Sequence, residues 1–216
     1  MKKAAKLSEE YFPKRPIHKE WVDLLKGFKK YLDRYRGDSD DVAYWYGERA
    51  LSGFFASVAW AAWAEGWSLE EFTGLRKDRK KQERNPGKGD LWIGIGEKEF
   101  TIEAKVAWSN GPILTTVTDV RNKLKEAKKQ LDHLDPKYRV GSPAAVCYVV
   151  PSLLASKTYG APSHQDQFFS KVPKMLSTSR RIVGAYRYKN DNNEMPNDAG
   201  RLYPGLIVVT QFWSAW

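Results

Sequence analysis

The sequence predicts an α/β domain in which helices flank a mixed central β-sheet. The segment AAVCYVV at 144–150 is uniformly apolar, as a central strand covered on both faces should be. Before it, residues 116–134 place apolar side chains at alternating spacings of three and four, which is typical of a helix with one buried face. The order along the chain is a helix, a hairpin, a helix and a strand, and this order favours layers of helix and sheet.

The N-terminal region, residues 1–40, is expected to be an arm and a helix packed on the core. Residues 1–17 contain two prolines and are interpreted as the arm. Residues 18–36 predict a helix, because apolar side chains recur at helical spacing with lysines between them. These apolar positions are Trp21, Leu24, Leu25, Phe28 and Leu32. GDSDD at 37–41 predicts a break and an acidic start for a second helix over 41–65, apolar enough to be buried on most sides.

The middle of the chain predicts a third helical segment and then a hairpin. Ser68 and Glu71 match the S-x-x-E capping box, and the helix they open is expected to run into the basic segment RKDRKKQER at 76–84. The sequence NPGKG ends that helix. Two strands are then predicted, near 90–95 and 99–107, with SNGP ending the second.

The C-terminal half predicts further helices and strands around the central strand. The apolar seam of the helix at 116–134 consists of Val117, Val120, Leu124, Ala127, Leu131 and Leu134. After the central strand we expect a short helix near 165–176, a strand near 181–188, a polar loop over 189–200 and a strand at 205–213.

Composition restricts the classes of function. Lysine and arginine number 36 against 26 acidic residues, and the net charge of +10 favours a polyanionic partner, although solubility alone also explains a basic surface. Cys147 is the sole cysteine, so the chain forms no intrachain disulfide and no cysteine-rich zinc site. The first residues lack the apolar core of a secretory signal, and the longest uncharged run, 50–64, is too short to span a membrane. We therefore expect a single-domain cytoplasmic protein with no membrane partner.

Polar side chains interrupt the predicted hairpin. Glu103 and Lys105 lie on the same face of their strand, because side chains alternate along a strand. The face of Asp90 depends on the turn. If Ile95 lies opposite Phe100, Asp90 faces Lys105 and all three polar groups share one face, whereas a slip of one residue sends Asp90 to the other side.

This trio predicts a site for a divalent cation. Two carboxylates held close together repel each other unless positive charge lies between them. Mg²⁺ prefers oxygen ligands and is commonly held by one or two carboxylates together with waters and substrate phosphate. A neighbouring lysine can hold an attacking water or offset the charge of a phosphate. The alternative is an exposed hairpin face with ordinary salt bridges.

Glu48 is a candidate third acid. It begins the stripe 48, 52, 55, 59 and 62 of the second helix, whose other members are apolar or small. A carboxylate on such a stripe costs free energy unless it is paired or bound to metal. A salt bridge to Arg49 or an exposed first turn would also account for it.

These motifs resemble the PD-(D/E)XK nuclease superfamily, which has the restriction-endonuclease-like fold. The sequence GD, in which Gly89 stands where the family's name has proline, is followed by IEAK at 102–105 and preceded by the helix that carries Glu48. The resemblance covers residues 41–151 within a nuclease-like domain at 41–216. It implies a core of the order α-β-β-β-α-β.

The resemblance also implies roles for individual residues. Asp90 matches the acid of the first half-motif, Glu103 and Lys105 match the second, and Glu48 matches the acid that many members carry on the first core helix. In the family the acids hold one or two Mg²⁺ ions and the lysine assists the water nucleophile. The strand that should precede Asp90 is not evident, so it is either hidden near 72–77 or the meander is modified.

The activity implied by the resemblance is Mg²⁺-dependent hydrolysis of DNA, with Mn²⁺ as a substitute ion and RNA left open as a substrate. Restriction, phage defence or repair are settings suggested by fold-level analogy. Cutting both strands of a duplex favours paired sites and hence a homodimer. Two alternatives remain open: a catalytically inactive or partner-dependent nucleic-acid-binding module of the same fold, and a protein-interaction module that uses aromatic surface.

Basic side chains near the motif are candidate contacts to the DNA backbone, although a run of charge is commonly a solvated face. One group precedes Asp90 and a second lies on the helix at 116–134. The first consists of Arg76, Lys77, Arg79, Lys80, Lys81 and Arg84, and the second of Arg121, Lys125 and Lys128.

The tryptophans divide into two groups. Trp108, just past Lys105, is a candidate for base stacking. Three others follow helical spacing, which favours positions in the core: Trp60, Trp63 and Trp67.

Overall fold

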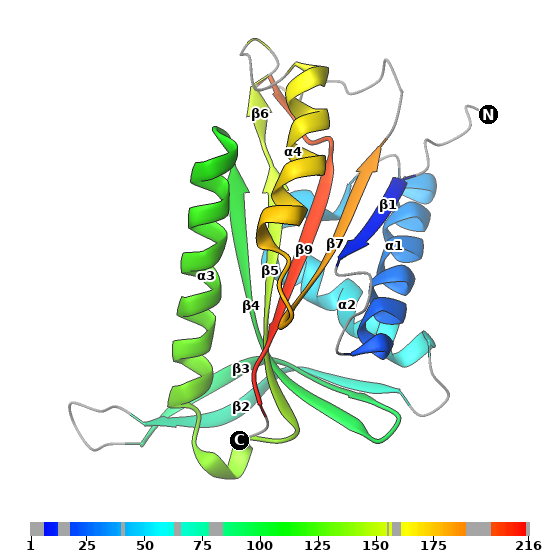
Figure 1. Cartoon of the computed structure of the whole chain (residues 1–216). Helices are drawn as coiled ribbons and strands as arrows, with labels where there is room; N and C mark the ends of the chain where they lie inside the picture. Colours follow the sequence, from blue (N-terminus) through cyan, green and yellow to red (C-terminus); the bar gives the residue numbers. More distant parts are fainter. Residues whose placement is uncertain are drawn as a thin grey trace.

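The computed structural model is a three-layer α/β structure in which a twisted sheet separates two helical layers (Figure 1). It describes residues 7–12, 18–39, 42–62, 66–77, 84–154, 156, 161–188 and 200–214. The main sheet has seven strands in the order β1-β7-β9-β5-β4-β3-β2. Neighbouring strands are antiparallel except β4 and β5, which are parallel, so the sheet is mixed as predicted.

The helices and strands of the described residues are bounded as follows. The helices are α1 Lys19–Ser39, α2 Glu48–Ala62, α3 Ile113–His133 and α4 Pro162–Leu176, with short 3-10 helices η1 Ala43–Tyr46 and η2 Pro136–Tyr138. The strands of the main sheet are β1 Leu7–Phe12, β2 Trp67–Lys77, β3 Arg84–Ile95, β4 Lys98–Ser109, β5 Ser142–Pro151, β7 Arg181–Tyr188 and β9 Gly205–Phe212. A separate pair consists of β6 Leu153–Leu154 and β8 Arg201–Leu202.

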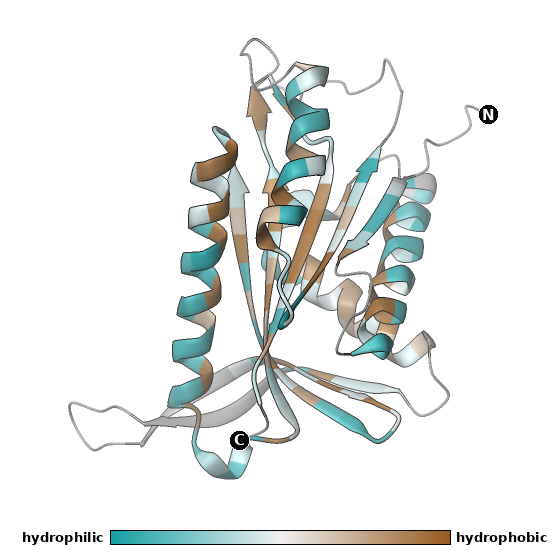
Figure 2. Ribbon diagram, in the orientation of Figure 1, coloured by the Kyte–Doolittle hydropathy of each residue, from teal (hydrophilic) through white to brown (hydrophobic). Residues whose placement is uncertain are grey.

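Each face of the sheet has its own hydrophobic core. Helices α1 and α2 cover one face, where Phe28 and Phe55 pack with Tyr148 of β5. Helices α3 and α4 cover the other face, where Val120 packs in a cluster with Cys147 of β5. The strands β5 and β9 are apolar through most of their length, while the outer sides of α1 and α3 are hydrophilic (Figure 2). This confirms the central strand covered on both faces.

Most of the predicted elements are confirmed. The helices expected at 18–36, 116–134 and 165–176 are α1, α3 and α4, and the strands expected at 181–188 and 205–213 are β7 and β9. Every member of the predicted α3 seam is buried. The polar loop lies outside the described residues apart from Gly200. None of the described helices is long and apolar enough to cross a bilayer.

The helix predicted from the capping box is wrong, because residues 67–77 form strand β2. This strand pairs antiparallel with β3, from Trp67 opposite Gly94 to Lys77 opposite Arg84. The Ser68 hydroxyl donates a hydrogen bond to the carbonyl of Ala56 in α2 (3.1 Å) instead of capping a helix. Pairing with β3 therefore overrides the local capping signal, and β2 is the strand that was not evident before Asp90.

The start of the second helix and the arm also differ from expectation. Helix α2 begins at Glu48, after η1, and not at residue 41. Residues 7–12 of the predicted arm form β1, which pairs antiparallel with β7 at the edge of the sheet. Trp60 is 62% exposed on α2, so its prediction as a core residue is wrong.

The register of the β3–β4 hairpin differs from the predicted one by two residues. Ile95 lies opposite Lys98 and not opposite Phe100, so Gly96 and Glu97 alone form the tip. Gly96 has φ +56°, as the tight two-residue turn requires. Because side chains alternate with a period of two, this slip exchanges partners without exchanging faces.

Candidate metal site

Asp90 lies where strand β3 stops pairing with β4. The two strands pair from Ile95 opposite Lys98 to Leu91 opposite Ile102. At the next position the Asp90 carboxylate accepts a hydrogen bond from the backbone N–H of Ala104, at 2.8 Å from N to Oδ2. The side chain thus replaces a backbone acceptor of the strand ladder, which fixes the carboxylate against β4.

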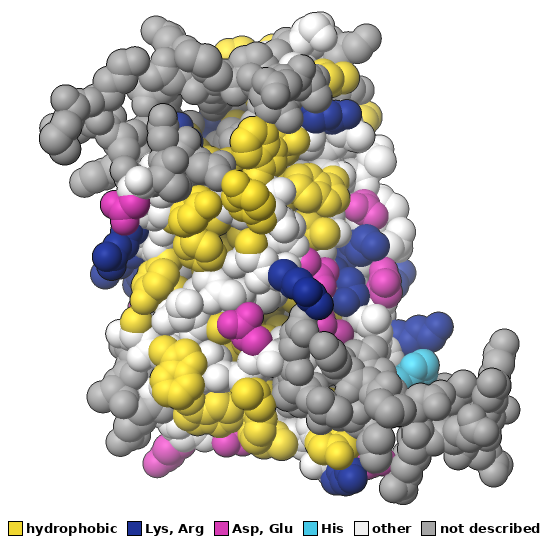
Figure 3. Space-filling model, turned by 180° about the vertical axis from the view of Figure 1, so that it is seen from behind, with side chains coloured by type: hydrophobic (Ala, Val, Ile, Leu, Met, Phe, Trp, Pro, Cys, Tyr) yellow, Lys and Arg dark blue, Asp and Glu magenta, His cyan; other side chains and the backbone are white. Residues whose placement is uncertain are grey.

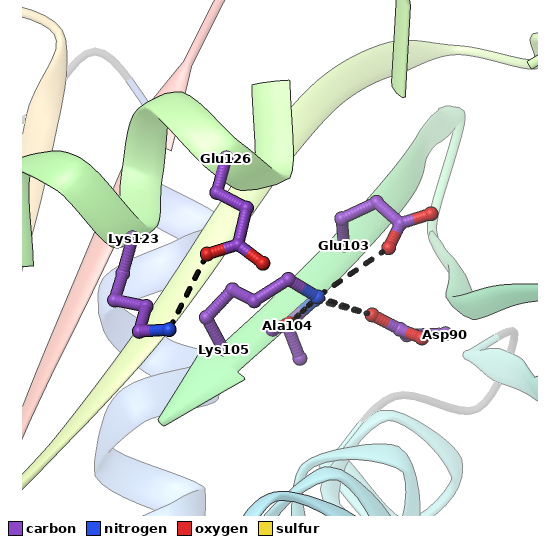
Figure 4. A network of polar contacts seen from close by, with 6 residues as sticks. All are labelled: Asp90, Glu103, Ala104, Lys105, Lys123 and Glu126. Atoms are coloured by element: carbon purple, nitrogen blue, oxygen red, sulfur yellow. Dashed lines mark hydrogen bonds and ion pairs between the residues drawn. The ribbon is translucent and has the colours of Figure 1, made fainter. Parts of the chain in front are cut away.

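Three oxygens surround the amine of Lys105 (Figure 4). The amine donates to the backbone carbonyl of Ala104 at 2.6 Å. Its Nζ lies 3.6 Å from Asp90 Oδ2 and 3.8 Å from Glu103 Oε2. The structure therefore brings together the two acids and the lysine of the predicted hairpin trio.

The trio is largely withdrawn from solvent. The exposed fraction is 3% for the Glu103 side chain, 13% for Lys105 and 28% for Asp90. A buried carboxylate is tolerated only with a compensating charge or hydrogen bonds, and Lys105 supplies that charge to Glu103. Two ionised carboxylates and one ammonium carry a formal charge of −1, which favours a further cation.

Glu48 lies within electrostatic reach of this trio. It is the first residue of α2 and is half-buried. Burial raises the pKa of its carboxyl group, the positive charge of Lys105 opposes that shift, and the negative charge of Asp90 adds to it. Its predicted stripe is buried at Ser52, and at Phe55 and Ala59. The helix N-terminus favours the ionised form, so burial and the helix dipole act on Glu48 in opposite directions.

Helix α3 adds two charges beside the site that the sequence interpretation did not include. Lys123 and Glu126 form an ion pair with 3.3 Å between Nζ and Oε2. Figure 4 shows this pair on the side of α3 that faces Lys105. Their charges also act on Glu48, where Lys123 lowers the pKa and Glu126 raises it. In the sequence, Lys123 and Glu126 are three residues apart on one side of the apolar seam of α3, a spacing that favours an ion pair on a helix.

The predicted DNA-contacting residues of α3 take other positions. Arg121 donates a hydrogen bond to the carbonyl of Met175 in α4 at 3.3 Å. Lys128 pairs with Asp132 and lies over the ring of Trp213. These two residues therefore line the flank toward α4 and the C-terminal segment, whereas Lys123 faces the site.

The remaining basic candidates are placed only in part. Lys125 is exposed on α3. Positions 76 and 77 belong to β2 and position 84 to β3, but the side chains of Arg76, Lys77 and Arg84 lie outside the described part of the chain. The residues between them, Arg79, Lys80 and Lys81, lie outside it altogether.

The oxygen atoms around the Lys105 amine are of the types that bind Mg²⁺. Two carboxylates and a backbone carbonyl are hard oxygen ligands, and the ammonium marks the point where they converge on one positive charge. Among the described residues no group of three or more His, Cys, Asp or Glu side chains is gathered around one point. Glu48 thus approaches the site without joining such a cluster, and an ion bound there requires the lysine amine to move aside.

Comparison of the chain with family models, with curated proteins and with solved structures finds no match. The functional interpretation therefore depends on the geometry of the site itself.

Proposed function

We propose that the protein is a Mg²⁺-dependent nuclease that hydrolyses phosphodiester bonds of DNA. The observation that carries this proposal is the convergence of Asp90, Glu103 and the Ala104 carbonyl on one cation position, with a lysine amine at that position. The order α2, β2, β3, β4, α3, β5 supports it, because it is the α-β-β-β-α-β order of a restriction-endonuclease-like core.

The residues of the site take distinct roles in the proposed reaction. Asp90 and Glu103 would hold the ion together with the carbonyl of Ala104, and Glu48 would be a further acid near it. When bound, Mg²⁺ supplies Lewis-acid polarisation of the phosphate and lowers the pKa of a coordinated water. Lys105, moved from between the acids, would hydrogen-bond the attacking water or offset the charge that develops on the phosphate.

The basic character of the chain supports a polyanionic substrate. The net charge of +10 accelerates encounter with DNA and predicts binding that weakens as salt rises. Lys123 adds a cation on the α3 side of the site, although Glu126 pairs with it at 3.3 Å. A phosphate bound at the site would compete with Glu126 for that ammonium.

A nicking assay on supercoiled plasmid tests the proposal. Wild type should nick DNA in Mg²⁺ or Mn²⁺ and not in EDTA, and Asp90→Asn and Lys105→Ala should each lower the rate at least about 100-fold. Matched controls are Asp132→Asn, an exposed acid of α3, and Lys98→Ala, a lysine at the other end of β4; both should retain the rate. Equal cleavage by wild type and both site variants would refute the assignment.

One observation favours a second function, a nucleic-acid-binding module of the same fold that does not cleave by itself. The Lys105 amine already occupies the cation position and bonds the Ala104 carbonyl at 2.6 Å. If this arrangement persists in Mg²⁺, no chemistry follows at the site. Binding of DNA by wild type and variants alike, without cleavage by any of them, would identify this function.

A further inference from the structure

Large exposed aromatic side chains lie on the segments that adjoin Glu48 and Lys105 in the chain. Three of them are substantially exposed, with exposed fractions of 38% for Trp45, 63% for Tyr46 and 44% for Trp108. Tyr203 is partly exposed beside them. We name these four residues the aromatic platform. Aromatic residues of this size are normally covered in a folded protein, so a group of them at the surface indicates a binding site.

Contacts link Tyr203 to Trp45 and, through Ser152, to the backbone beside Trp108. The ring of Tyr203 meets the ring of Trp45 with 5.0 Å between centroids. The Tyr203 carbonyl accepts a hydrogen bond from the Tyr44 hydroxyl at 2.9 Å. Ser152 contacts the Tyr203 hydroxyl through its own hydroxyl at 3.4 Å, and its N–H donates to the carbonyl of Ser109, the neighbour of Trp108, at 2.7 Å. Segment η1, the residues after β8 and the end of β4 thus form one surface.

Two members of the aromatic platform lie within three residues of site residues in the sequence. Trp108 is three residues beyond Lys105 on β4, about 10 Å along the strand, so its side chain lies on the opposite face of the strand from Lys105, the face of Val106 that packs in the core of α1 and α2. Tyr46 ends η1, two residues before Glu48. Seen from the side of α1 and α2, hydrophobic side chains gather above a central group of charged side chains (Figure 3).

A fixed cation borders the aromatic platform. The guanidinium of Arg201 donates hydrogen bonds to the carbonyl of Ser152 at 3.0 Å and to its hydroxyl at 3.2 Å. Since Ser152 also contacts Tyr203, the guanidinium is held next to the aromatic rings. Flat rings with a positive group beside them form the arrangement that binds unpaired nucleotides, whose bases stack and whose phosphates are anionic.

We propose that the aromatic platform stacks unpaired bases of a DNA single strand whose backbone continues into the metal site, so that the substrate is single-stranded or has a frayed or flap end. The inference rests on the proposed function and specifies its substrate class. In a duplex the faces of the bases are already stacked on each other and cannot cover the rings. A single strand offers those faces, and each stacked base adds affinity with little dependence on sequence.

Binding in EDTA tests this inference without cleavage. A fluorescein-labelled oligothymidylate and a labelled duplex of equal length are titrated with the protein, and anisotropy is measured at several salt concentrations. Wild type should bind the single strand more tightly than the duplex. Trp45→Ala and Trp108→Ala should each weaken single-strand binding about 5- to 100-fold and change duplex binding less than about twofold. Because no charge is removed, the salt dependence should stay the same.

Matched variants control for loss of structure. Trp60→Ala removes a tryptophan that is 62% exposed at the far end of α2, about 18 Å along the helix from Glu48, and should leave both affinities unchanged. Trp108→Phe keeps a ring and should retain most of the single-strand affinity. Equal affinity for single strand and duplex, or unchanged binding by Trp45→Ala and Trp108→Ala, overturns the inference.

The test also separates this inference from the nuclease proposal and from another occupant. Selective single-strand binding without cleavage in Mg²⁺ would leave the aromatic platform supported and the nuclease proposal refuted. Cleavage that is indifferent to strandedness and to both tryptophan variants would do the reverse. Sedimentation in which dimers of wild type disappear in Trp45→Ala would assign the surface to a second copy of the chain and overturn the inference.

Discussion

Replacing Lys105 with methionine tests the electrostatic balance of the candidate site. The substitution keeps an unbranched side chain one atom shorter and removes the ammonium from between Asp90 and Glu103. The ammonium lies 3.8 Å from the Glu103 carboxylate, whose side chain is 3% exposed. At an effective dielectric constant of about 20, this attraction amounts to about 4 kcal/mol. Removing one partner of a buried pair costs about 3–5 kcal/mol, so we expect a loss of about 3 kcal/mol in the free energy of unfolding.

Thermal and urea unfolding in EDTA measure this loss. For a chain of 216 residues, about 3 kcal/mol corresponds to a fall in Tm of about 6–12 °C. Lys98→Met is the matched control, since Lys98 pairs with Glu20 at 2.7 Å with both side chains at least a third exposed, and it should cost less than about 1 kcal/mol. Addition of Mg²⁺ should raise the Tm of Lys105→Met more than that of wild type, because no ammonium has to leave.

A double variant identifies the source of the loss. Glu103→Gln with Lys105→Met leaves a neutral pair, so it should recover about 2 kcal/mol relative to Lys105→Met alone. Two results would refute the reasoning: a loss for Lys105→Met no larger than that for Lys98→Met, or strictly additive effects of the two substitutions at 103 and 105.

Three further substitutions test Glu48 and two packing contacts elsewhere in the fold. Burial raises the pKa of the Glu48 carboxyl group above 4.5, so the ionised carboxylate destabilises the folded protein at pH values above that pKa. Glu48→Gln should therefore raise the Tm of the metal-free protein at pH 7. A gain in Tm that persists well below pH 4.5 would contradict this explanation. A Cβ on Gly94 would lie 2.2 Å from Trp67 Nε1, so Gly94→Ala should cost about 1–3 kcal/mol in urea unfolding, and less in a Trp67→Leu background. Trp21→Phe removes the buried bond from Nε1 to Thr210 Oγ1 (2.8 Å) and should cost about 1–3 kcal/mol, part of which Thr210→Val should restore in the double variant.

The helices and central strands could be predicted because their apolar periodicity is local and strong. The seam of α3 is buried throughout, and β5 is buried from Pro143 to Pro151. Strand β2 could not be predicted in the same way, because its state depends on a partner strand. Ser68 and Glu71 fit a helix start, but pairing with β3 places residues 67–77 in the sheet. The sequence window alone contains no measure of that pairing.

The hairpin trio was predictable for a different reason. The predicted register was displaced by two residues from the observed one, yet Asp90, Glu103 and Lys105 still converge, because only an odd slip exchanges the faces of a strand. The contribution of Lys123 and Glu126 was not predictable. Periodicity defines which stripe of α3 is buried, but the rotation of the helix over β4 decides which flank meets the site.

The local backbone explains why the site forms at this point of the sheet. Strand β4 pairs with β5 from Phe100 to Ser109, whereas its recorded pairing with β3 ends at Ile102. Beyond that residue the β4 backbone groups on the β3 side need other partners. The Asp90 carboxylate accepts from the N–H of Ala104, and the Lys105 amine donates to its carbonyl.

Asp90 and Lys105 therefore supply the hydrogen bonds that strand β3 no longer makes to the backbone of Ala104. This arrangement bears on the proposed function. A group that satisfies the Ala104 carbonyl in place of the amine, such as a divalent ion, can release Lys105 without leaving a buried acceptor unpaired. Under the proposed function, movement of the lysine toward substrate would then be coupled to binding of the ion. A structure of the Mg²⁺ complex in which the Lys105 amine still donates to the Ala104 carbonyl would refute this coupling.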